Sequence, residues 1–88
     1  MTIQVYGAVG CSQCEQFKLK LFREAKKDKE QGGTGEKFEY EYIMLDEALK
    51  EELATKFGNL PRSLPYIVNG DKFYSFAQAD AFIKELKS

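Results

Sequence analysis

Strand-like and helix-like spacings of apolar residues alternate along this chain, and that alternation most restricts how it can fold. Ile3, Val5 and Tyr6 form a short β-branched and aromatic run that ends at Gly7, which predicts a strand. From Ser12 to about Lys29 the apolar positions follow one face of an amphipathic helix. These positions are Cys14, Phe17, Leu21, Phe22 and Ala25. A strand, a helix and a later strand in this order predict a parallel pair joined by a helical crossover.

The rest of the chain continues the alternation without a visible linker or repeat. Its predicted elements are a strand over residues 38–45, a helix opened by Asp46 and stopped by Gly58-Asn59, a hairpin of strands 66–68 and 72–74 joined by Asn69-Gly70, and a last helix opened by Ser75. The order is β-α-β-α-β-β-α. It predicts an α/β fold with a four-stranded mixed sheet and three helices, in which residues 1–88 form a single domain.

The composition removes several classes of function. Thirteen basic residues stand against fourteen acidic ones, so no global field attracts nucleic acid or an anionic membrane. No apolar run is long enough to span a membrane, and the N-terminus lacks a secretory signal pattern, so we expect a cytoplasmic protein. The chain has no histidine, which excludes Ser-His and Cys-His nucleophiles and His-ligated zinc. We expect neither a metal nor a tightly bound cofactor.

The remaining candidates for reactive residues are the pair Cys11 and Cys14. Two cysteines are too few for a disulfide-stapled scaffold, and their spacing closes too small a loop to constrain the unfolded chain much. If Cys11 caps the first helix, its sulfur faces unpaired N–H groups and the positive end of the helix dipole, which lowers its thiol pKa. Cys14 lies on the apolar face and is less accessible. These positions predict that Cys11 attacks a disulfide and Cys14 resolves the mixed disulfide.

The cysteine pair is part of a wider pattern. Val5-Tyr6-Gly7 leads to Gly10-Cys11-Ser12-Gln13-Cys14, and Ser63-Leu64-Pro65 precedes a predicted strand. In these motifs the chain resembles the glutaredoxins, which implies the thioredoxin fold and a dithiol-disulfide oxidoreductase with glutathione as co-substrate. The resemblance also implies a cis Pro65 beside the cysteines, and a Leu64 backbone that offers an N–H and a C=O to an extended thiol substrate. The residues that it implies for binding substrate or glutathione are Gln13, Ser63, Leu64, Pro65, Tyr74 and Ser75.

The chain also departs from most glutaredoxins. Ser12-Gln13 stands where they have Pro-Tyr, Ala8 stands in place of a basic residue, and Tyr74-Ser75 stands in place of Gly-Gly. These features resemble the glutaredoxin-like redoxins that serve ribonucleotide reductase and take electrons from thioredoxin reductase, and small phage glutaredoxins mix both sets of traits. The expected partners are a protein disulfide, with ribonucleotide reductase as one candidate, and glutathione or thioredoxin reductase as electron source. The candidate contacts for glutathione carboxylates are Lys56, Arg62 and the helix start at Ser75.

The CxxC motif allows a second interpretation of the function. A CxxC motif between a loop and a helix also binds Cu(I) in small copper chaperones, so a soft-metal carrier for Cu(I) or zinc is the alternative function. Those carriers, however, have a β-α-β-β-α-β order.

Two other features also allow two interpretations. Tyr74 either packs at a sheet edge or flanks the sulfur groove. The basic residues of the first helix form either a solvated face or a docking surface for an acidic partner.

Overall fold

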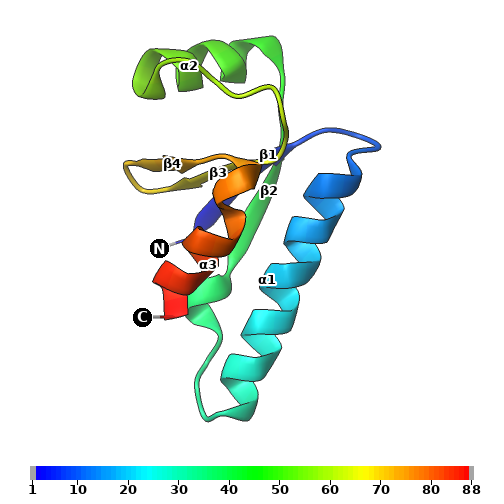
Figure 1. Cartoon of the computed structure of the whole chain (residues 1–88), viewed down its shortest axis with the longest axis vertical. Coiled ribbons are helices and arrows are strands. Elements are labelled where there is room, and N and C mark those ends of the chain that lie inside the picture. Colours follow the sequence, from blue (N-terminus) through cyan, green and yellow to red (C-terminus); the bar gives the residue numbers. More distant parts are fainter. Residues whose placement is uncertain (1, 88) are drawn as a thin grey trace.

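A computed structural model of the protein describes residues 2–87 and shows the α/β order expected from the sequence (Figure 1). Its strands and helices are β1 (Ile3–Gly7), α1 (Ser12–Glu30), β2 (Tyr40–Met44), α2 (Glu47–Phe57), β3 (Tyr66–Asn69), β4 (Lys72–Tyr74) and α3 (Ala79–Lys87). Two short 3₁₀ turns, η1 (Glu36–Phe38) and η2 (Phe76–Gln78), precede β2 and α3.

The four strands form one mixed sheet in the order β2-β1-β3-β4. β1 and β2 are parallel, with Val5 opposite Tyr42. β1 and β3 are antiparallel, with Tyr6 opposite Tyr66, and β3 forms a hairpin with β4. The predicted parallel pair, helical crossover and final hairpin are therefore confirmed, in an arrangement compatible with a thioredoxin-like fold. As a result, the end of β1 and the start of β3 meet at the same end of the sheet.

Helices cover both faces of this sheet (Figure 1). α1 and α3 pack on the face that carries Val5 and Ile67. α2 packs on the opposite face, where Tyr6 lies in one cluster with Leu53. Because successive strand residues point to opposite faces, Gly7 belongs to the face that α1 covers. This places the last residue of β1 beneath the first turns of α1.

The second strand begins later than the sequence predicted. Residues 38–45 were expected to be extended, but η1 occupies residues 36–38 and β2 begins at Tyr40. Gly35 precedes the turn with a φ of 77°, and its carbonyl accepts a hydrogen bond from the Phe38 N–H at 3.1 Å. Phe38 is nevertheless buried in the core beside α1. Its apolar character therefore reflects burial and not strand geometry.

The two later helices begin differently. α2 begins as predicted, because Asp46 Oδ1 accepts a hydrogen bond from the Leu49 N–H at 2.8 Å. Ser75 does not lead directly into a regular helix, since η2 intervenes before α3 begins at Ala79. The Ser75 N–H donates to Gln78 Oε1 at 3.0 Å, which stabilises this first turn.

Candidate functional site

Cys11 is the residue at which the loop after β1 turns into α1. Its backbone is extended, with φ −83° and ψ 102°, and its sulfur accepts a hydrogen bond from the Cys14 N–H at 3.1 Å. The Cys11 carbonyl accepts a hydrogen bond from the Glu15 N–H at 3.2 Å. Gly10 makes the preceding turn with a φ of 76°, a conformation that favours glycine. Cys11 is therefore the N-cap of α1, with its sulfur at the positive end of the helix.

The two sulfurs have different surroundings. Cys11 is half-buried, whereas Cys14 has 0% of its surface exposed. Their Cα atoms are 5.3 Å apart and their sulfurs form a disulfide. Because Cys14 is inaccessible, a disulfide from outside can reach only Cys11. This asymmetry fits an attacking role for Cys11 and a resolving role for Cys14.

Gly7 lies directly against the buried sulfur. A Cβ atom at this position would be 2.8 Å from Cys14 Sγ and 2.8 Å from Tyr42 Cζ, and closer still to the Tyr42 hydroxyl oxygen. Carbon atoms do not approach such neighbours so closely, so only glycine fits between the sulfur and the phenol. Gly7 has no positive φ, and its requirement is therefore one of space. The sequence pattern predicted only that a strand ends at Gly7, and it did not indicate this close contact.

Pro65 lies beside Gly7, on the side of β1 that faces β3. It follows a cis peptide bond from Leu64, as the resemblance to glutaredoxins implied. The antiparallel register of β1 and β3, continued one step beyond its last pair, places Pro65 across from Gly7. Pro65 is buried, Leu64 is half-buried against the α2 side of the core, and Ser63 is exposed. Two segments that are distant in sequence thus meet at Gly7, the residue that borders the Cys14 sulfur.

Tyr42 of β2 and Lys18 of α1 adjoin this site, although sequence patterns did not reveal them. The Tyr42 hydroxyl donates to the Ala8 carbonyl at 3.3 Å, in the loop that leads to Cys11. The Lys18 ammonium lies 4.0 Å from the centre of the Tyr42 ring and 2.9 Å from Glu15 Oε1. Its hydrogen bond to Glu15 raises the pKa of Lys18 above the usual lysine value. The only sequence signal was that Tyr42 falls on the core-facing side of a strand.

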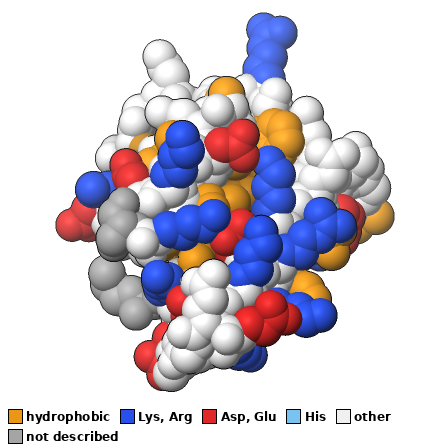
Figure 2. Space-filling model, turned by 60° about the horizontal axis from the view of Figure 1, so that its bottom comes forward, with side chains coloured by type: hydrophobic (Ala, Val, Ile, Leu, Met, Phe, Trp, Pro, Cys, Tyr) orange, Lys and Arg blue, Asp and Glu red, His pale blue; other side chains and the backbone are white. Residues whose placement is uncertain are grey.

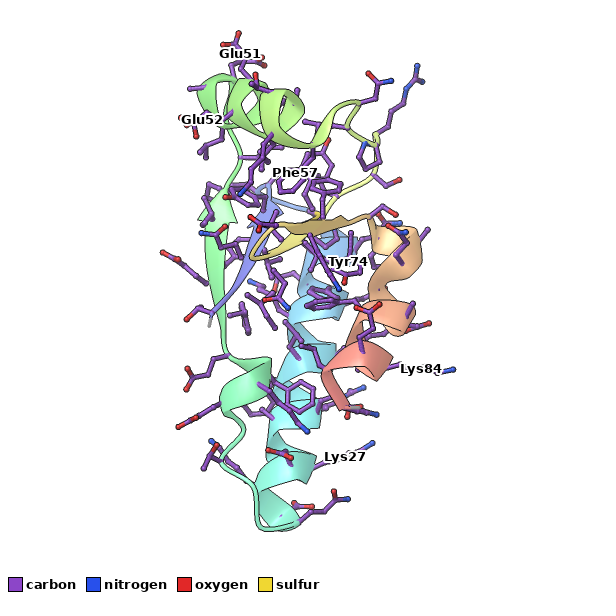
Figure 3. All side chains as sticks on the ribbon, turned by 90° about the vertical axis from the view of Figure 1, so that its left-hand side faces the viewer. Lys27, Glu51, Glu52, Phe57, Tyr74 and Lys84 are labelled. Atoms are coloured by element: carbon purple, nitrogen blue, oxygen red, sulfur yellow. A yellow bond between two sulfur atoms is a disulfide. The ribbon has the colours of Figure 1, made fainter. Side chains whose placement is uncertain are left out.

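Tyr74, a predicted binding residue, lies in the core between β4 and α3 (Figure 3). Its ring centre is 4.7 Å from that of Phe82, and its hydroxyl donates to Glu85 at 2.5 Å. This hydrogen bond, together with burial, raises the pKa of Tyr74 to about 12. These contacts support the packing interpretation, while a role beside the sulfur stays a prediction. The adjacent Ser75 N–H is already used by Gln78.

The other predicted binding residues are distributed over several elements. Gln13 is exposed in the first turn of α1, and Arg62 is exposed in the loop before β3. Lys56 Nζ lies 3.9 Å from Asp71 Oδ1 and 5.2 Å from the centre of the Phe57 ring. Figure 3 shows Phe57 between α2 and the sheet. A carboxylate of the protein itself therefore already partners Lys56. Glutathione binding by these residues stays a prediction.

On one face of the molecule, basic side chains are interspersed with acidic ones (Figure 2). Lys20 is 2.9 Å from Asp80 Oδ1, and Lys87 is 2.9 Å from Glu24 Oε2. The hydrogen bond from Lys20 lowers the pKa of Asp80. These ion pairs connect α1 with α3, so Lys20 and Lys87 have a structural role. A docking surface on the other basic residues of α1 stays a prediction. Within residues 2–87, no helix is both long and apolar enough to cross a membrane.

The alternative of a soft-metal carrier stays a prediction. The observed element order differs from the β-α-β-β-α-β order of small copper carriers. In the described part of the chain, no group of three or more His, Cys, Asp or Glu side chains could hold a metal ion. Comparison with models of known families, with curated proteins and with solved structures finds no match. The function must therefore be inferred from the geometry of the β1–α1 junction.

Proposed function

We propose that this protein is a glutaredoxin-like dithiol-disulfide oxidoreductase. The observation that carries the proposal is the half-buried Cys11 sulfur at the N-cap of α1, 3.1 Å from the Cys14 N–H. Such a position stabilises a thiolate, the form of cysteine that attacks disulfides. The cis peptide bond before Pro65 and the four-stranded mixed sheet also support a relationship to the glutaredoxins.

In the proposed cycle the Cys11 thiolate attacks a substrate disulfide. The substrate S–S bond breaks, a mixed disulfide forms with Cys11, and the first thiolate leaves and takes a proton. Cys14 then loses its proton and attacks the Cys11 sulfur, which displaces the second substrate thiolate. Two electrons have passed from the dithiol to the substrate. The Cys11–Cys14 disulfide seen in the structure is the oxidised product.

The substrate is proposed to lie in an extended conformation beside Leu64. There the Leu64 backbone N–H and C=O would bind it in the manner of an added strand. This mode suits protein disulfides, with that of ribonucleotide reductase as one candidate, and glutathione mixed disulfides. Support comes from the exposed Ser63 and the buried Pro65, since Leu64 lies between them in the segment that leads into β3 beside the end of β1.

Two single-cysteine variants test the assignment of roles. Cys11→Ser should abolish reduction of a protein disulfide, because no accessible thiolate remains. Cys14→Ser should retain only turnover through a mixed disulfide with glutathione. Ser12→Ala changes an exposed residue of the same turn and serves as the matched control, with activity close to that of the parent protein. Dithiol activity in Cys11→Ser would show that the roles are wrongly assigned.

The electron source is tested with two reducing systems in parallel. Disulfide reduction is followed with glutathione and glutathione reductase, and separately with thioredoxin reductase. We expect turnover with glutathione, and we expect Cys14→Ser in glutathione buffer to carry a mixed disulfide detectable by mass spectrometry. Absence of that adduct, with turnover by thioredoxin reductase alone, would reject glutathione and favour the flavoprotein as donor.

A further inference from the structure

The resolving cysteine has an unusual polar neighbour. Gly7 presents one face to both Cys14 Sγ and the Tyr42 hydroxyl, since these are the nearest atoms that a Cβ on Gly7 would meet. The sulfur and the phenol oxygen thus border the same small space at the end of β1. In the disulfide form the hydroxyl donates to the Ala8 carbonyl at 3.3 Å, a long and therefore weak hydrogen bond. The phenol hydrogen can turn to another acceptor by rotation about one bond.

Cys14 needs such a donor when it acts. Its side chain has 0% exposure, and burial disfavours the charged form of a thiol. The N–H of Cys14 itself is directed at Cys11 and does not serve its own sulfur. The chain has no histidine that could take the proton or stabilise the thiolate. The titratable and charged groups on the elements packed around this space include Cys11, Glu15 and Lys18 of the β1–α1 junction and α1. From β2 they include Tyr42 and Tyr40, and Tyr40 also acts on the charge of Lys18.

We propose that the Tyr42 hydroxyl donates a hydrogen bond to the Cys14 thiolate during the resolving step. Lys18 is a positioning residue for it, because its ammonium lies over the Tyr42 ring at 4.0 Å and is held there by Glu15 at 2.9 Å. A cation over the ring face also makes the phenol a stronger donor. Tyr42 does not lose its proton. The Cys14 proton passes to solvent, the Cys14–Cys11 bond forms, and the bond from Cys11 to the substrate sulfur breaks.

This inference rests on the proposed dithiol function, but its first test does not require activity. In a Cys11→Ser protein, Cys14 is the only cysteine, and its ¹³Cβ chemical shift followed across pH reports its thiol pKa. Tyr42→Phe keeps the ring and removes the donor. Because a hydrogen bond to a charged group contributes on the order of a factor of ten or more, the thiolate fraction of Cys14 should fall roughly tenfold at a pH below its pKa.

Tyr40→Phe is the matched control, since Tyr40 lies on the same strand and the same face but is not among the atoms nearest to Gly7. It should leave the pKa of Cys14 unchanged. Lys18→Gln should raise that pKa by less than Tyr42→Phe does, and Lys18→Arg should restore it. An unchanged Cys14 pKa in Tyr42→Phe, or equal shifts in Tyr42→Phe and Tyr40→Phe, would overturn the proposal.

The second readout uses the protein with both cysteines. Quenched-flow measurement of mixed-disulfide decay should show resolution slowed roughly threefold in Tyr42→Phe, because the higher nucleophilicity of a more basic thiolate offsets part of the tenfold loss of thiolate. Formation of the adduct at Cys11 should be unchanged. If the parent protein forms no mixed disulfide at all, the oxidoreductase function fails, while the titration still decides the role of Tyr42. If turnover occurs and resolution in Tyr42→Phe is as fast as in the parent, the function stands and the role of Tyr42 is rejected.

Discussion

The packing around Gly7 leads to a quantitative expectation for Gly7→Ala. The added Cβ would lie 2.8 Å from Cys14 Sγ and from Tyr42 Cζ, so both side chains must shift. Overpacking of this kind costs about 1–3 kcal/mol. Replacing a strand glycine by alanine recovers roughly 0.5–1 kcal/mol of backbone entropy. The difference between these two ranges is about 0–2.5 kcal/mol. We expect the free energy of unfolding to fall by a value inside that interval, about 1–2 kcal/mol, with Tm lowered by roughly 4–8 °C for each kcal/mol.

The same substitution should change the redox equilibrium. In the oxidised protein the disulfide holds Cys14 Sγ in place, whereas in the reduced protein the sulfur can turn away from the new methyl group. Gly7→Ala should therefore destabilise the oxidised form more and make the reduction potential less negative. The change is about 30 mV for each 1.4 kcal/mol of difference between the two forms. Urea denaturation of both forms and equilibration with dithiothreitol measure the two effects.

Making Gly7→Ala in the Tyr42→Phe protein shows whether the contact with Tyr42 causes the loss of stability. Tyr42→Phe removes the hydroxyl oxygen, the nearest neighbour of the new Cβ, but leaves Cζ in place. Gly7→Ala should consequently cost less in the Tyr42→Phe protein than in the parent, as a positive coupling between adjacent sites. Unchanged stability and potential in Gly7→Ala would refute the close approach of Gly7 to the sulfur and the phenol.

Two further predictions concern other parts of the fold. Asp46→Ala removes the acceptor of the Leu49 N–H and should lower the free energy of unfolding by about 1 kcal/mol in urea denaturation, whereas Asp46→Asn should retain most of the stability. Glu85→Gln should lower the pKa of Tyr74 from about 12, as measured by ultraviolet titration. Because the folded pKa lies above the ordinary value of 10.0, this hydrogen bond stabilises the fold fully below pH 10, and the contribution is lost as the pH rises toward 12. A stability profile over that range that is the same in Glu85→Gln would contradict this assignment.

The element order could be predicted because each element carries a local signal. The apolar stripe of α1, the Asp46 cap and the Asn69-Gly70 turn each depend on neighbours in sequence. The same local character explains why Cys11 could be placed at the N-cap. It also explains the error at Phe38, which lies in the segment 38–45 that was predicted as a strand. The backbone of this segment is instead a 3₁₀ turn that follows the left-handed Gly35.

The surroundings of the buried sulfur could not be predicted in the same way, because they depend on register between distant segments. Tyr42 lies beside Gly7 only because β2 pairs with β1 so that Val5 is opposite Tyr42. A shift of one residue would turn Tyr42 to the α2 side of the sheet. No local pattern determines that choice across a crossover as long as α1. Tyr74 is similar, since its contact with Glu85 depends on how α3 packs against β4.

Because the chain has no histidine, other groups must stabilise the two thiolates in the proposed mechanism, and these groups differ between Cys11 and Cys14. Cys11 depends on backbone N–H groups at the start of α1, among them that of Cys14 at 3.1 Å. A side-chain substitution cannot remove these donors while the helix persists. Cys14 depends instead on the Tyr42 hydroxyl and on the Lys18 cation over its ring. Variants of Tyr42 and Lys18 should therefore alter the acidity of Cys14 and leave that of Cys11 unchanged, so that the resolving step can be tuned separately from the attacking step.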